Sequence, residues 1–154
     1  IFNKNDKTAH LVFFNDQYNT DYTSSAFFGA FQITSISIET QICFRKRDLL
    51  DRIKISTKKS GIKDFDSKFV LCNDSSYPTS LNLNNSVDLI YKSLNLYDNL
   101  HFSINMMNLS FIPELKDVST IGIYQPDQWV TDKETLDEMY KNIKLINHKL
   151  TNAF

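Results

Sequence analysis

Hydrophobic and polar residues alternate along several stretches of the chain, and this alternation predicts β-strands. It is clearest over 100–106, where every second residue from Leu100 to Met106 is apolar and the residues between them are polar. Shorter stretches of similar character predict strands at 9–14, 68–72 and 120–124 and near 109–111.

A longer alternating stretch covers residues 27–42, and its apolar positions change phase between Ile33 and Ile36. A phase change in a half-buried strand is typical of a bulge or a turn. We therefore expect either an antiparallel hairpin or one bent strand, with the break near Thr34 and Ser35.

Two stretches show the apolar spacing of helices. Residues 84–96 carry apolar residues at helical spacing after Asn84 and Asn85, either of which can cap a helix. In 131–151 the apolar stripe continues for five turns, and Thr131 with Glu134 forms a capping-box pattern. The elements together predict an α+β fold: a mainly antiparallel sheet of about six or seven strands with these two helices packed on one face.

Length and composition fit a single soluble domain covering residues 1–154, which we expect to be a fragment of a longer protein. The chain has 17 basic and 18 acidic residues and a net charge of −1. Nucleic-acid binders usually carry a basic excess, so no nucleic-acid partner is expected. With three glycines in total, the chain lacks the glycine-rich fingerprints of nucleotide sites and of the hydrolase nucleophile elbow, so we expect no cofactor.

The two cysteines, Cys43 and Cys72, lie in separate apolar runs. We expect two buried thiols that pack as small hydrophobic side chains. A disulfide is the second interpretation, and the sequence does not tell whether the pair is oxidised. A metal site is the third and least favoured interpretation, because neither cysteine has another cysteine or a histidine nearby in the sequence at the spacing of zinc ligands.

Acidic and basic residues form two clusters that could carry chemistry. Asp64 and Asp66 flank Phe65 and could bind a divalent cation, but we expect them to support a turn before the next strand. The basic run at 45–47 is expected to be a solvated loop; an RNA-binding face and a contact with anionic lipid are the alternatives. We assign no catalytic and no metal-binding residue, and the binding residues stay unknown.

The stretch from Ser60 to Leu115 contains three phrases in a distinctive order. Residues 61–70 have the form G-x-x-x-F-D-x-x-F-V, residues 99–104 form an apolar–polar strand, and residues 111–115 read F-I-P-E-L. This arrangement resembles an uncharacterised bacterial family in which two N-terminal membrane helices precede a soluble domain. The resemblance implies an upstream membrane anchor and a place on the cytoplasmic side of the bacterial inner membrane; without an anchor, the protein would be cytoplasmic.

The resemblance assigns no catalytic residues. It implies a buried turn in which the rings of Phe65 and Phe69 enter the core while Asp66 accepts hydrogen bonds from backbone amides of the loop.

These observations lead to two functional hypotheses. The first is a non-catalytic binding or assembly domain that contacts protein partners or another copy of itself through the helix at 131–151, and that meets the membrane only through an upstream anchor. The alternative is a metal-dependent hydrolase built on Asp64 and Asp66 with a histidine such as His101. We favour the first, and therefore a protein that is not an enzyme.

Overall fold

The computed structural model describes residues 9–16, 25–35, 41–53, 59–72, 83, 86–105, 112–126, 128–129 and 132–151. Its centre is one antiparallel sheet of six strands in the order β1-β2-β6-β5-β3-β4. The strands are β1 (Ala9–Asp16), β2 (Ser25–Ile33), β3 (Ile42–Lys46), β4 (Phe69–Leu71), β5 (His101–Ile104) and β6 (Thr120–Gln125).

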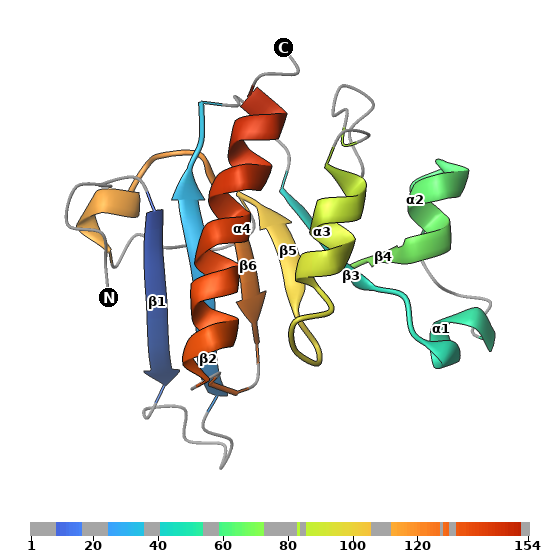
Figure 1. The fold of residues 1–154 in the computed structure, drawn as a ribbon, viewed down its shortest axis with the longest axis horizontal. Helices are drawn as coiled ribbons and strands as arrows, with labels where there is room; N and C mark the ends of the chain where they lie inside the picture. The colour runs from blue at the N-terminus through green and yellow to red at the C-terminus, as the bar shows by residue number, and fades with distance from the viewer. Residues whose placement is uncertain are drawn as a thin grey trace.

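Two helices cover one face of this sheet. Figure 1 shows α3 (Val87–Ser93) and α4 (Lys133–Thr151) side by side in front of the strands. The short helices α1 (Leu49–Ile53) and α2 (Lys63–Lys68) lie beyond the β4 end of the sheet, away from β1 (Figure 1). A short 3-10 turn, η1 (Pro113–Leu115), precedes β6. The predicted α+β fold, with its mainly antiparallel sheet, is confirmed.

The helix-covered face holds the larger apolar core. Alternate residues of the strands point into it, and the buried residues of α4 meet them, because a strand places every second side chain on one face. The α4 residues in this core are Met139, Ile143, Ile146 and Leu150. The apolar stripe predicted for the last helix therefore packs on the chain's own sheet.

The opposite face carries a smaller cluster of buried residues that includes Phe27, Phe31, Cys43, Leu115 and Tyr124. The Phe31 ring lies over two glycines on this face. A Cβ built on Gly29 or on Gly122 would come within 3.0 Å of the ring. Both positions therefore need glycine for close packing, which is a common use of glycine inside a sheet.

One sequence prediction needs correction. The stretch 27–42 does not form a hairpin: β2 pairs with β1 and β6, whereas β3 pairs with β4 and β5. Alternation identifies strands but not the strands they pair with, and in this sheet β6 and β5 lie between β2 and β3. At the start of α4, Asp132 accepts a hydrogen bond from the Thr135 amide (2.7 Å), while Thr131 of the predicted capping box lies outside the described residues.

Several predicted features lie outside the described residues. These are Asn84, Asn85 and Thr131, the second part of the 27–42 stretch, and the strand expected near 109–111. Within the described part of the chain, no helix combines the length and the apolar character needed to cross a bilayer.

Candidate functional site

Two regions of the described structure gather chemically distinctive side chains, and both adjoin β3. We call the first the Cys–His cluster: Cys43, Cys72, His101 and Tyr124. On β3, Cys43 lies between Ile42 and Phe44, which enter the helix-covered core, so its side chain points to the opposite face. The same alternation on β5 sends Phe102 into the core and His101 to the face that carries Cys43.

The two cysteines of this cluster form a disulfide, with their Cα atoms 5.3 Å apart. The bond joins β3 to the residue after β4, and the Cys72 amide also donates to the Cys43 carbonyl (2.9 Å). Our expectation of two free thiols is therefore wrong. The sequence separation of 29 residues hides the pairing, because only the antiparallel register of β3 and β4 places the residues opposite each other. A cross-link over a loop of this length stabilises a fold by about 3–4 kcal/mol.

The imidazole of His101 lies against both sulfurs. Its Nδ1 atom is 3.7 Å from Cys43 Sγ and 3.7 Å from Cys72 Sγ. Its other nitrogen, Nε2, lies 3.4 Å from the side-chain oxygen of Asn99. Donation from Nε2 to Asn99 leaves the Nδ1 lone pair directed at the sulfurs. The His101 side chain is half-buried in this cluster.

Tyr124 closes one side of the cluster. Its hydroxyl lies 3.1 Å from Cys43 Sγ, and its ring meets the His101 ring edge-on with centroids 5.3 Å apart. Burial disfavours the phenolate and raises the pKa of Tyr124 to about 12. The phenol is therefore neutral throughout the physiological range.

The second region follows β3 directly, and we call it the α1 corner: Lys46, Arg47, Asp48, Leu49 and Leu50. These five residues line an open hollow of about 450 Å³. Leu49 is 74% exposed and Leu50 is 63% exposed. These adjacent leucines form a small exposed apolar surface next to Lys46 and Arg47.

An ion pair next to the corner fixes the turn that presents it. Arg45 donates two hydrogen bonds to the carboxylate of Asp51, at 2.6 and 2.7 Å. Asp51 is buried, and its hydrogen bonds with Arg45 are the largest cause that lowers its pKa to about 2. Asp48 accepts from the Asp51 amide (2.8 Å). The charge of Arg45 is thus neutralised inside the domain.

Arg47 differs from Arg45. Its backbone amide donates to the Lys68 carbonyl (2.8 Å), which anchors the residue beside α2. Its Nε atom is buried and has no hydrogen-bond partner within the described ranges. Arg47 as a whole is half-buried, and none of the ion pairs within the described ranges involves its guanidinium.

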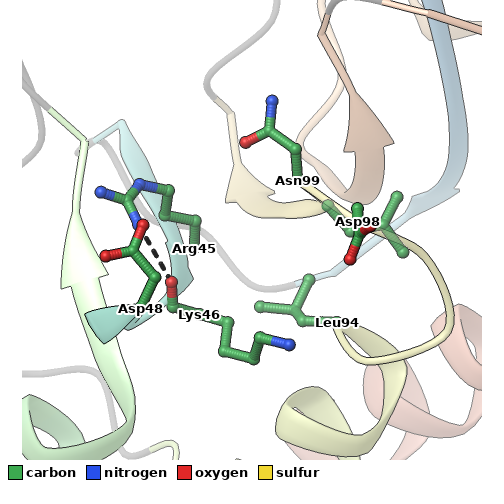
Figure 2. Close-up of a pocket in the computed structure, with 7 residues that line it drawn as sticks. Arg45, Lys46, Asp48, Leu94, Asp98 and Asn99 are labelled. Carbon is green, nitrogen blue, oxygen red and sulfur yellow. Dashed lines mark hydrogen bonds and ion pairs between the residues drawn. The ribbon is translucent and has the colours of Figure 1, made fainter. Parts of the chain in front are cut away.

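A smaller pocket of about 290 Å³ adjoins the corner. Figure 2 shows Arg45 and Asp48 on one side of it, with the Lys46 side chain extended toward Leu94 and with Asp98 and Asn99 on the other side. The Lys46 ammonium donates to the side-chain oxygen of Asn95 (2.7 Å). Residues of opposite charge thus line this pocket, so it favours neither an anionic nor a cationic ligand.

The structure does not bring Asp64, Asp66 and His101 together as potential metal ligands; in the described part of the chain, the one such group is Cys43, Cys72 and His101. Asp66 accepts hydrogen bonds from the amides of Ser60 (2.8 Å) and Gly61 (3.1 Å). The expected burial of Phe65 and Phe69 and the hydrogen bonds from loop amides to Asp66 are confirmed, but Phe65 and Asp66 lie in the helix α2 and not in a turn.

No protein-family model matches the chain, and neither the curated proteins nor the solved structures include a match. The resemblance over Ser60–Leu115 therefore stays a prediction.

Sequence reasoning missed the Cys–His cluster. A signal for the cluster was present in the strand phase, because Cys43 and His101 both fall between core residues of their strands. The pairing of β3 with β4 and with β5 was needed to bring them together, and no local pattern specifies that pairing.

Proposed function

We propose that this chain is a non-catalytic binding domain that holds an acidic and apolar segment of a partner protein at the α1 corner. The observation that carries the proposal is the exposure of Leu49 and Leu50 next to the half-buried Arg47, whose guanidinium forms no ion pair among the described residues.

The corner offers a partner two kinds of contact. Covering Leu49 and Leu50 with apolar side chains would gain roughly 25 cal/mol per Å² removed from water. A carboxylate placed on Arg47 would form charge-assisted hydrogen bonds with a guanidinium that no acidic group of the described chain neutralises. Arginine is one of the residue types enriched at the centres of protein interfaces.

A site-specific photo-crosslinker tests this proposal in the full-length protein, in the cells that make it. Placed at position 50, it should capture a protein that the same crosslinker at position 145 does not capture. Leu145 on α4 is the matched control because it is also exposed (44%) and lies outside the corner. The captured protein is then purified, and its affinity is measured for the wild type and for Arg47→Ala and Leu50→Ser. Each substitution should weaken binding at least about tenfold.

Three results would contradict the proposal. One is equal capture from positions 50 and 145, and another is an affinity that neither substitution changes. The third is Leu50-dependent sedimentation with anionic phospholipid vesicles in the absence of any captured protein, because the corner would then bind a membrane surface.

The wider setting that we propose is a bacterial protein whose upstream anchor holds this domain at the cytoplasmic side of the inner membrane. It is supported by the resemblance over Ser60–Leu115. Fractionation of the full-length protein tests it: release by detergent but not by salt is the expected result, and a freely soluble protein would contradict the anchor. The crosslinking experiment decides the binding proposal separately.

The hydrolase alternative gains no comparable support. Asp66 already accepts hydrogen bonds on both carboxylate oxygens, from Ser60 and from Gly61. Those bonds give Asp66 a structural role, because they tie Ser60 and Gly61 to the helix α2.

A further inference from the structure

We propose that reduction of the Cys43–Cys72 disulfide converts the Cys–His cluster into a binding site for one zinc ion, with Cys43 Sγ, Cys72 Sγ and His101 Nδ1 as the protein ligands.

The positions of the three atoms support this assignment. They lie within 4.8 Å of one another, and Nδ1 is 3.7 Å from each sulfur. In a tetrahedral zinc site, bond lengths of about 2.3 Å to sulfur and 2.0–2.1 Å to nitrogen put nitrogen about 3.6 Å from sulfur. The same lengths put two sulfurs about 3.8 Å apart. The nitrogen is therefore already placed, and only the sulfurs must separate once their bond is broken.

The chemistry of the ligands favours zinc. Thiolates and imidazole are the donors from which zinc sites are built. The side-chain oxygen of Asn99 accepts a hydrogen bond from His101 Nε2–H, which favours the tautomer whose Nδ1 can coordinate a metal. Many zinc-binding histidines are oriented in the same way by a hydrogen bond from the ring nitrogen that does not bind the metal. Cys72 and His101 are half-buried, so an ion can reach the cluster from solvent.

The conversion has two balanced steps. A dithiol reductant transfers two electrons and two protons to the disulfide; the Cys43–Cys72 bond breaks, and the reductant closes its own disulfide. Zinc then displaces one proton from each thiol as two zinc–sulfur bonds form, and Nδ1 donates its lone pair. Water can occupy the fourth position of a three-ligand site.

The site is tested with the purified chain in two forms, one with the disulfide intact and one reduced by a phosphine. In the reduction the phosphine becomes a phosphine oxide, with its oxygen taken from water. Zinc binding is measured by competition with a coloured chelator. Cobalt(II) replaces zinc in a parallel titration, because a tetrahedral thiolate site gives it strong visible and near-ultraviolet absorption. We expect one ion per reduced chain and none per oxidised chain.

Variants locate the ligands. Cys72→Ser and His101→Gln should each weaken zinc binding at least about tenfold and should change the cobalt spectrum. His148→Gln is the matched control, since His148 is an exposed histidine on α4.

Far-ultraviolet circular dichroism of each sample completes the design. If the reduced chain loses its fold, zinc must restore the native spectrum, because metal binding would then be coupled to folding. The proposal is overturned if the reduced chain binds no ion, if Cys72→Ser and His101→Gln bind as tightly as the wild type, or if zinc fails to restore an unfolded reduced chain.

Discussion

The carboxylate of Asp51 is buried against the guanidinium of Arg45, and two short hydrogen bonds join them. Those bonds are the main reason why the pKa of Asp51 falls from 3.8 to about 2. A carboxylate whose pKa is lower in the folded state stabilises the fold above its unfolded pKa. That contribution is present above about pH 4 and is lost as the pH falls through about 2.

Asp51→Asn should therefore lower the free energy of unfolding by about 2 kcal/mol at pH 7. The difference from the wild type should shrink by pH 2.5, where the native carboxylate is itself becoming protonated. Denaturant unfolding of both proteins at the two pH values measures this.

Asp137→Asn is the control for Asp51→Asn, because Asp137 pairs with Lys133 on the exposed side of α4. Exposed pairs contribute little, so this variant should match the wild type at both pH values. A stability loss for Asp51→Asn that is the same at pH 7 and at pH 2.5 would contradict our account of the ion pair.

Between elements, the contact of β2 with β6 depends on the ring of Phe31 lying over Gly122. Gly122→Ala would force its new methyl group into that ring, and overpacking of this kind costs about 1–3 kcal/mol. In the background of Phe31→Leu, which shortens the side chain, the same substitution should cost clearly less. Thermal or denaturant unfolding of the two single variants and the double variant gives this coupling.

Gly61→Ala is the matched control for Gly122→Ala. A Cβ at Gly61 would meet nothing within 4 Å, but its φ of +86° favours glycine. The expected cost is about 1 kcal/mol from the backbone alone, and Phe31→Leu should leave that cost unchanged. Additive effects of Gly122→Ala and Phe31→Leu would show that the ring and the glycine do not interact.

The same elements show what the sequence can predict. Alternation located β1, β5 and β6, and helical spacing located α3 and α4, because each signal lies within one short segment. The neighbours of β2 and β3 could not be predicted, since β2 pairs with β6, about ninety residues later in the chain. The Cys–His cluster was missed for the same reason: its members come from four segments whose register only the sheet defines.

At the scale of the whole molecule, the redox state of its compartment decides what the Cys–His cluster does. Disulfides persist in oxidising compartments and are rare in the cytoplasm. In an oxidising compartment the Cys43–Cys72 bond would join β3 to β4, at the edge of the sheet that carries the α1 corner. On the cytoplasmic side of a membrane, where we propose the domain lies, the thiols and His101 would be available to zinc.

Self-association through the last helix can be tested at the same scale. Met139, Ile143 and Ile146 are buried in the domain's own core, so they offer nothing to a second copy. Deleting residues 145–154 would remove Ile146 and would therefore test stability rather than association.

Leu145→Glu is the sharper variant, because Leu145 is the large apolar residue that the described part of α4 leaves exposed. A stable interface buries about 800 Å² on each partner, far more than one leucine provides. We therefore expect light scattering to give the same mass for Leu145→Glu and the wild type across a concentration series. A wild-type mass twice that of the variant would instead establish α4 as a dimer contact.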